Sequence, residues 1–199
     1  MRSATARASH GLRWLVVACL VALLARIEPA HADTDDRRAL VVLRVLAYDK
    51  HLGERVGDVV RVVVVYPKGD DDEAARWRAA FAKISKLKVD GRSVVIAAQE
   101  IDKPEQLGRA LATLKPAALI ACDGLAKRIA IEDVAKATRA NRVLSFSTRA
   151  GEVEQGLAVG IVPGKEHDEI VVNMTAAAAE GVKFDAGLLQ LARTVRGSQ

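Results

Sequence analysis

The chain has 199 residues and a formal net charge of +5. Its first 32 residues hold four Arg and one Glu, so residues 33–199 carry 26 basic and 24 acidic side chains, a net charge of only +2. A nucleic-acid-binding surface needs Lys and Arg clustered on one face, and no such cluster is present in the sequence. Nucleic acid is therefore excluded as an expected partner, and residues 33–199 suit a single domain with its own core.

Residues 1–32 have the three parts of a secretory signal peptide. A basic start without acidic residues precedes eleven consecutive apolar residues, 15–25 (LVVACLVALLA). The segment ends in the A-x-A pattern that signal peptidase recognises, with small residues at Ala30 and Ala32. The basic residues are Arg2, Arg7 and Arg13. The sequence therefore predicts a cleavable leader over 1–32 and export of residues 33–199.

Two other interpretations of the leader stay open. A retained membrane anchor needs roughly 20 apolar residues, more than this run supplies. Lipoprotein processing at Cys19 is the second, because residues 16–19 loosely resemble a lipobox, although the chain stays apolar after Cys19. Once the leader is removed, Cys122 is the single cysteine, so an intramolecular disulfide is impossible, and its place after an apolar run predicts a buried core residue.

Strands and helices are predicted to alternate over residues 35–147. The strand segments are rich in β-branched or small apolar residues, whereas the helical segments carry apolar residues at three- and four-residue spacing. The expected elements are a helix over 35–52, a strand over 59–66, a helix from 70–73, a strand over 92–98, a helix from 102–105, a strand over 117–122, a helical stretch over 124–140 broken near Ile131, and a strand over 143–147. The apolar stripes are Ala74, Trp77, Phe81, Ile84 and Leu87 in one helix and Leu107, Ala110, Leu111 and Leu114 in the next.

This alternation predicts right-handed crossovers and a mainly parallel sheet with flanking helices, an α/β fold of Rossmann-like or flavodoxin-like type. The pattern then changes to a predicted β-hairpin, formed by 157–162 and 169–174. Thr175 is expected to cap a short helix over 176–180. Asp185 is expected to cap a last helix, whose inner face would carry Leu188, Leu189, Ala192 and Val195.

The residues that usually perform catalysis or bind metals form no recognisable pattern. His51 and His167 lack the spacing of a zinc site and are expected to be exposed. The acidic run 70–73 lacks the spaced ligands of a calcium loop, and helix capping explains it more simply. Ser145, Ser147 and Thr148 do not lie in G-x-S-x-G, and no dinucleotide fingerprint or phosphate loop is present. We therefore predict no catalytic residue, no metal and no cofactor.

A weak ligand-binding hypothesis remains at the carboxyl ends of the predicted strands. Ligands of open parallel sheets bind in the crevice outside these ends, where the sequence places Asp123, Gly124, Ser147 and Thr148, with 67–69 and Gln99 beside them. Asp123-Gly124 leads into a helical stretch, so backbone N–H groups are expected to face the crevice. Ordinary loop and capping chemistry is the alternative explanation of the same residues.

The C-terminal stretch resembles the end of the YfiR-like family in the order of its motifs. These are a glycine-containing strand, 156–161, a hairpin return ending in Asn173, an Ala-rich helix, a Gly-Val-Lys break at 181–183, and a helix carrying L-L-x-L-A-R at 188–193. The resemblance implies a small periplasmic protein. In the best-known member it implies a repressor of an inner-membrane diguanylate cyclase that acts through the periplasmic sensor domain of that enzyme.

Two departures from the family separate this chain from that member. Its paired cysteines are missing here, which argues against redox control, and the aromatic-Trp-Pro segment near the family's start is replaced by 45–50 (VLAYDK). The preferred hypothesis is a non-enzymatic periplasmic regulator that docks on a membrane-embedded signalling protein or receptor. A periplasmic small-ligand binding protein is the alternative and an enzyme is the third choice. The oligomeric state, including a homodimer, stays open.

Overall fold

The structure, a computed structural model, describes residues 30–196, with side chains from Thr34 onward. Most of the predicted signal peptide, residues 1–29, lies outside the described residues, and so do the side chains of Ala30 and Ala32 at its expected cleavage site. From Asp35 onward the chain forms one compact unit.

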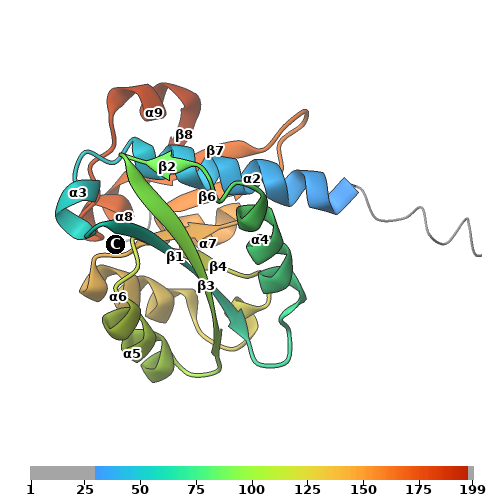
Figure 1. Cartoon of the computed structure of the whole chain (residues 1–199). Helices are drawn as coiled ribbons and strands as arrows, with labels where there is room; N and C mark the ends of the chain where they lie inside the picture. Colours follow the sequence, from blue (N-terminus) through green and yellow to red (C-terminus); the bar gives the residue numbers. More distant parts are fainter. Residues whose placement is uncertain (1–29, 197–199) are drawn as a thin grey trace, which may run out of the picture. The chain divides into compact units, whose positions relative to one another are not determined.

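An eight-stranded sheet forms the centre of the described chain, in the order β2-β3-β1-β4-β5-β6-β7-β8 (Figure 1). The five central strands β3, β1, β4, β5 and β6 run parallel to one another. At the two sides, β2 pairs antiparallel with β3 and β7 pairs antiparallel with β6. The last strand, β8, is parallel to β7. Their bounds are Val59–Pro67 (β1), Lys88–Val89 (β2), Arg92–Ile101 (β3), Ala118–Ala121 (β4), Leu144–Ser147 (β5), Val159–Val162 (β6), Glu169–Asn173 (β7) and Ala192–Val195 (β8). The predicted mainly parallel α/β fold with a β-hairpin is confirmed.

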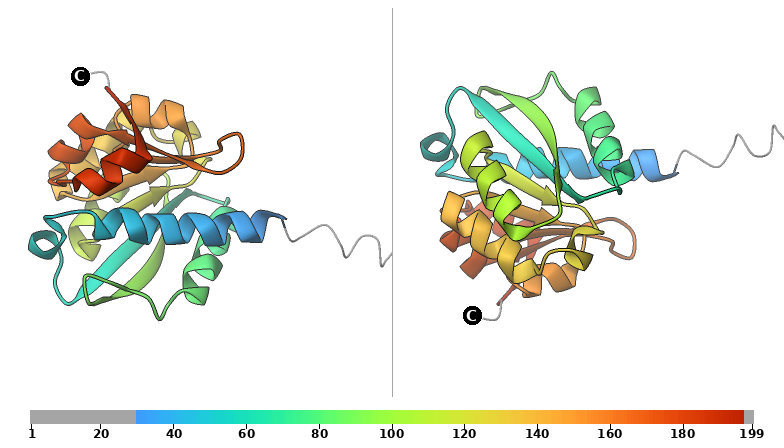
Figure 2. Two further views of the ribbon diagram at one scale, coloured as in Figure 1. Left: turned by 90° about the horizontal axis from the view of Figure 1, so that it is seen from above. Right: turned by 90° about the horizontal axis from the view of Figure 1, so that it is seen from below.

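Helices cover both faces of this sheet (Figure 2). They are α2 (Ala30–Ala47), α3 (Leu52–Arg55), α4 (Asp72–Lys83), α5 (Pro104–Leu114), the short 3-10 helix η1 (Leu125–Lys127), α6 (Ile131–Asn141), α7 (Ala150–Glu154), α8 (Met174–Ala179) and α9 (Ala186–Leu191). None of the helices in this described part of the chain combines the length and the apolar character that a membrane span requires.

The strand β1 contacts the helices on both faces of the sheet. Its side chains alternate between two buried clusters: Val62 and Val64 pack with α2 and α4, whereas Val63 and Val65 pack with α5 and α6. The nearly all-apolar run at 59–66 therefore marks a central strand that is buried on both faces, as its composition predicts.

Several predicted boundaries are wrong for local reasons. The first helix ends at Ala47 rather than residue 52, and a separate turn of helix follows in α3. The apolar stripe of α4 ends at Phe81, because the helix ends at Lys83 and Leu87 is 45% exposed. Asn173, and not Thr175, caps α8 by accepting a hydrogen bond from the backbone N–H of Ala176.

The last predicted helix is also too long. Asp185 does cap it, accepting from the N–H of Gly187, but α9 ends at Leu191. Ala192 and Val195 belong instead to β8, which pairs with β7. An apolar residue at every third or fourth position cannot by itself distinguish a helix from a short strand at its end.

Candidate functional site

The candidate site lies where β4 and β5 end, and the structure brings two of its four predicted residues into contact. β4 and β5 are adjacent and parallel, with Ala121 paired with Ser147, so the residues that follow both strands meet at one edge. There the Thr148 hydroxyl donates a hydrogen bond to the Asp123 carboxylate. Arg149 lies on the same carboxylate, with its Nε 3.4 Å from Asp123 Oδ1.

Gly124 contributes to this site by its small size. A Cβ at this position would lie 2.8 Å from an Asp70 carboxylate oxygen and 3.0 Å from the Pro67 ring. The segments after β1 and β4 therefore touch at Gly124, and any side chain there would require the Asp70 carboxylate and the Pro67 ring to shift. The structure thus adds a packing role for Gly124, whose predicted part in ligand binding stays a prediction.

Ser147, the fourth predicted residue, is buried, and its hydroxyl bonds to α7 and to the residue before it. Its hydroxyl donates to Glu152 Oε2 at 2.6 Å and accepts from the Arg149 backbone N–H at 2.9 Å. The hydroxyl therefore holds the start of α7, an element that the sequence analysis missed.

Glu73 also belongs to this site, although the sequence suggested only a capping role for it. One carboxylate oxygen accepts the backbone N–H of Asp123 at 2.8 Å, and the other accepts the Trp77 indole N–H at 3.3 Å. Burial raises the pKa of Glu73, the N–H of Asp123 opposes that shift, and the negative charge of Asp123 reinforces it.

Glu152 is the second acid that the sequence analysis missed. Its side chain is 4% exposed, and its Oε1 is a buried oxygen without a hydrogen-bond partner among the described residues. Burial raises the pKa of Glu152, whereas the Ser147 hydroxyl and the Arg149 charge lower it. The sequence gives one sign of this residue, an acid shortly after a predicted strand. The burial of Glu152, however, depends on the packing of the hairpin strands β6 and β7 against α7.

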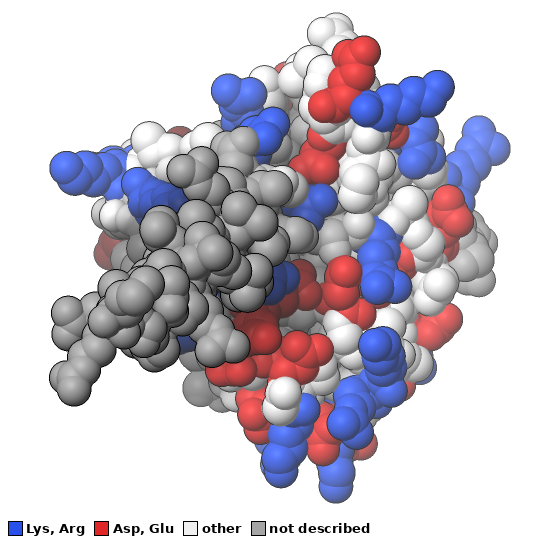
Figure 3. All heavy atoms as spheres, turned by 90° about the vertical axis from the view of Figure 1, so that its right-hand side faces the viewer, with Lys and Arg blue, Asp and Glu red and all other residues white. Residues whose placement is uncertain are grey.

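Neighbouring charges and exposure complete the description of this end of the sheet. Figure 3 shows a face on which Asp and Glu side chains gather near the middle, with Lys and Arg mostly around them. Asp123 and residues 70–72 are exposed acids. Burial raises the pKa of the Cys122 thiol, and the nearby carboxylates add to that shift, so the thiol is a protonated core group and not a nucleophile.

Among the residues whose side chains are described, no group of three or more His, Cys, Asp or Glu side chains could hold a metal ion. His167 is exposed, as expected, whereas His51 is half-buried and contacts Asp49 through its backbone N–H.

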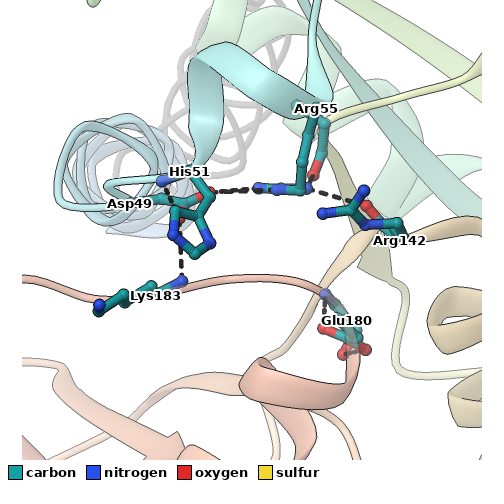
Figure 4. A network of polar contacts seen from close by, with 8 residues as sticks. Asp49, His51, Arg55, Arg142, Glu180 and Lys183 are labelled. Atoms are coloured by element: carbon teal, nitrogen blue, oxygen red, sulfur yellow. Dashed lines mark hydrogen bonds and ion pairs between the residues drawn. The ribbon is translucent and has the colours of Figure 1, made fainter.

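At the opposite, amino ends of the strands lies a second polar network, centred on a buried ion pair (Figure 4). Arg55 and Asp49 are joined at 2.6 Å, and their side chains are 2% and 0% exposed. The Arg55 guanidinium also donates to the carbonyls of Ala117, immediately before β4, and Arg142, two residues before β5. The second Asp49 oxygen accepts the N–H groups of His51 and Lys183, so this charge pair links four segments of the chain.

Glu180 is a fully buried carboxyl group near the same end. One oxygen accepts from the hydroxyls of Thr138 and Ser145 at 2.7 Å each, and the other accepts the Ser145 N–H at 2.9 Å. The Ser145 oxygen in turn accepts the N–H of Ala158. Burial raises the pKa of Glu180 to about 7, although the hydrogen bonds from the Ser145 hydroxyl, the Thr138 hydroxyl and the Ser145 N–H all act to lower it. Ser145 is thus part of the core and not a nucleophile.

Comparison with solved structures supports the fold class. A ligand-free, open substrate-binding protein with adhesive properties from Clostridium difficile matches with a TM-score of 0.57 at 14% identity, covering 81% of this chain and 60% of that one. A conserved domain protein from Vibrio cholerae matches with a TM-score of 0.56 at 17% identity, covering 80% of this chain and 59% of that one. An ABC domain in complex with L-Trp from Streptococcus pneumoniae matches with a TM-score of 0.55 at 13% identity, covering 77% of this chain and 61% of that one. These likenesses show an α/β fold, and the chain spans about three fifths of the length of each of the three structures.

The family is established by the sequence itself. The model of the DUF4154 family, described as YfiR/HmsC-like, matches residues 78–193, more than half of the chain. The chain belongs to this YfiR/HmsC-like family, as its C-terminal motifs indicate. A search among curated proteins finds no match.

Proposed function

We propose that the protein is an exported, non-enzymatic regulator that acts in the periplasm by binding a membrane-embedded signalling protein. The observation that carries this proposal is the family match over residues 78–193, which extends from α4 into β8. By resemblance to the best-known member, the partner is an inner-membrane diguanylate cyclase with a periplasmic sensor domain. The missing cysteine pair leaves redox control out of the proposal.

The state of the candidate nucleophiles supports a binding rather than a catalytic role. The hydroxyls of Ser145 and Ser147 each hydrogen-bond to a buried glutamate. The Cys122 thiol is buried with a raised pKa. A catalytic nucleophile needs an adjacent base and also access to a substrate. The two serines have an adjacent carboxylate, but all three groups are buried, at 2% exposure or less.

We place the contact with the partner at the carboxyl ends of the strands. Asp123 and Arg149 are paired there, yet their side chains remain 49% and 55% exposed. Exposed charged groups of this kind steer association and set the choice of partner. The Asp49–Arg55 pair at the opposite end is fully buried, so it offers no charge to a partner.

Export is tested by determining the amino terminus of the protein recovered from the periplasm. Intact-mass measurement should give a chain that begins at Asp33, which corresponds to loss of residues 1–32. A chain that keeps the leader, or one that begins at a lipid-modified Cys19, would contradict this part of the proposal.

The regulator hypothesis is tested by chemical crosslinking in the native envelope, followed by affinity capture of the tagged protein and mass spectrometry. We expect enrichment of one inner-membrane protein with a periplasmic sensor domain, relative to an unrelated exported protein with the same tag. Recovery of no envelope protein above that control would argue against the regulator.

A second candidate function, binding of a small ligand, is favoured by one specific observation. Glu152 Oε1 is buried and has no hydrogen-bond partner within residues 30–196, and Ser147 links Glu152 to the segment that carries Thr148 and Arg149. A donor group of a small ligand, such as an amine, would complete the hydrogen bonding at this position. The charge of Arg149 and the pair Asp123–Thr148 would then select among ligands.

A thermal-shift screen against metabolites tests this second function. A ligand at 100 times its Kd adds roughly 2.7 kcal/mol to the free energy of unfolding. Asp123→Asn should reduce the shift, whereas Asp133→Asn, an exposed carboxylate on α6 that pairs with Lys136, should leave it unchanged. A screen without any shift would exclude the ligand-binding function but would leave the regulator untouched.

A further inference from the structure

A cavity of about 440 Å³ lies at the amino ends of the strands, away from the candidate site at their carboxyl ends. It is enclosed by α3, by the ends of α5 and α6, and by the residues that lead from these two helices toward β4 and β5. Sites for small organic ligands usually measure about 300–1,000 Å³, so this cavity has room for such a molecule and not only for an ion. Its lining includes Arg55, Leu111, Lys115, Pro116, Asn141 and Arg142.

Two exposed cations in this lining have no acidic partner within the described part of the chain. Lys115 and Arg142 are exposed, and no carboxylate among the described side chains forms an ion pair with either of them. Arg55 is matched by Asp49 at 2.6 Å, and Glu54 is the one acid among the described residues that line the cavity. The lining is therefore left with a positive charge.

The helix ends at which the two cations lie do not account for them. Carbonyl groups at a helix C-terminus carry partial negative charge, which Lys and Arg side chains commonly offset. Here other arginines provide this balance: Arg61 donates to the Leu114 carbonyl at the end of α5, and Arg55 donates to the Arg142 carbonyl just after α6. The charged groups of Lys115 and Arg142 thus remain available to a ligand.

The backbone at both cations has a conformation that favours glycine. Lys115 follows α5 with φ of 44°, and Arg142 follows α6 with φ of 54°, both in the left-handed region. This region is strained for residues that carry a Cβ, so helices that end in this way usually have Gly or Asn there. A long cation stands at both positions instead, and strained residues of this kind are typical of functional sites.

Buried contacts hold the two cations in place beside the cavity. Gly181 leaves room for the Arg142 side chain, since a Cβ on that glycine would lie 2.8 Å from Arg142 Nε. Arg55 donates to the carbonyls of Ala117 and Arg142 at 3.2 and 2.9 Å, which ties the segments before β4 and β5 to each other (Figure 4). The backbone that carries the cations is therefore fixed before a ligand arrives, as a binding site requires.

We infer that this cavity binds a phosphate-bearing ligand, with the phosphate group held between Lys115 and Arg142. The oxygens of a phosphate point in several directions, so cations from two separate segments can contact the same group, Lys as a point charge and Arg as a fork of donors. Apolar lining residues, Ala112 and Ala140 among them, contact the remainder of the ligand. This inference goes beyond the proposed function and does not depend on it, because the proposed partner contact lies at the opposite ends of the strands.

Isothermal titration calorimetry on residues 33–199, which contain the whole compact unit, tests the site. Glycerol 3-phosphate is the probe and glycerol is the neutral control, and the wild type should bind only the first. K115Q/R142Q should bind it about tenfold more weakly or worse, because charge-assisted hydrogen bonds are lost. K127Q/R128Q removes the same charge from two exposed cations after β4 and should bind like the wild type. Equal binding by K115Q/R142Q and the wild type would overturn the inference.

A glycine variant separates the loss of binding from a loss of folding. K115G/R142G removes both cations and relieves the strained backbone. It should bind glycerol 3-phosphate as weakly as K115Q/R142Q, yet unfold at the urea concentration of the wild type or above it. A glycine variant that binds the probe as tightly as the wild type would overturn the inference.

Vesicle flotation distinguishes a soluble ligand from a lipid headgroup with the same chemistry. Binding of glycerol 3-phosphate identifies a soluble phosphate ester. Binding to phosphatidylglycerol vesicles alone, lost in K115Q/R142Q and kept in K127Q/R128Q, identifies a headgroup. Both results support recognition of phosphate at this cavity. A wild-type chain that binds neither probe would overturn it.

Discussion

The two ends of the parallel strands treat their polar groups in opposite ways. At the amino ends, Asp49, Arg55 and Glu180 are buried, and each makes several hydrogen bonds to neighbouring segments. At the carboxyl ends, Asp123 and Arg149 are about half exposed, and one buried oxygen of Glu152 has no partner in the described part of the chain.

This difference separates groups that stabilise the fold from groups that are available for binding. A buried charge is tolerated only when it is paired and hydrogen-bonded, so the amino-end network ties α2, α3 and the starts of β4 and β5 together. The exposed charges at the carboxyl end stabilise the fold little. Substitutions at the two ends should therefore have different consequences.

The largest expected effect comes from Arg55→Met. The substitution leaves the Asp49 carboxylate buried without its cation and removes the donor to two backbone carbonyls, so the free energy of unfolding should fall by about 3–5 kcal/mol. Urea unfolding near neutral pH measures this loss. Lys83→Met, which breaks an exposed pair with Asp36, is the control and should cost less than about 1 kcal/mol. Equal losses in the two variants would contradict the distinction between the two ends.

A pH-dependent effect of intermediate size is expected from Glu180. Its folded-state pKa of about 7 lies above the value of 4.5 for an ordinary Glu, so the folded state binds the proton more tightly. The stabilisation that comes from the protonated carboxyl is complete below about pH 4.5 and is lost as the pH rises through about 7.

The variant Glu180→Gln removes this titration and isolates the contribution of the group. The free energy of unfolding of the wild type, minus that of the variant, should decrease from about pH 5 to about pH 8. Parallel urea titrations of both proteins across that range provide the measurement. A difference that stays constant with pH would show that Glu180 does not titrate with a raised pKa.

The smallest effect on stability is expected from Asp123→Asn. The side chain is 49% exposed, so the free energy of unfolding should change by less than about 1 kcal/mol. The substitution should also lower the pKa of Glu73, because the negative charge of Asp123 contributes to raising it. Carboxyl titration by NMR reports this pKa, and Asp133→Asn is the matched control. An unchanged pKa of Glu73 would contradict the proximity of the two acids.

Local sequence patterns were sufficient to predict the central architecture. The run of β-branched residues at 59–66 predicted a strand buried on both faces, and the alternation of apolar stripes with such runs predicted a parallel sheet. That sheet also explains why Asp123 and Thr148 meet, because residues that follow adjacent parallel strands share one edge.

The remainder depended on contacts between residues that are far apart in the chain. Glu73 joins Asp123 across 50 positions, and Glu180 reaches Ser145 across 35, so no spacing rule could connect them. The packing roles of Gly124 and Ser147 were missed for the same reason: the close approach of the 67–70 loop and the burial of Glu152 appear only after the elements pack. The Asp49–Arg55 pair lies six residues apart, but its burial depends on β4 and β5.

The most direct test of this account is the amount of envelope protein that crosslinks to three forms of the mature chain. These are the wild type, D123N/R149A at the carboxyl end, and D133N/K136A, which removes another exposed ion pair on α6. We predict that all three unfold alike, that D123N/R149A captures much less of the partner, and that D133N/K136A captures the wild-type amount. Equal capture by all three forms would contradict the claim that the carboxyl ends of the strands bind the partner.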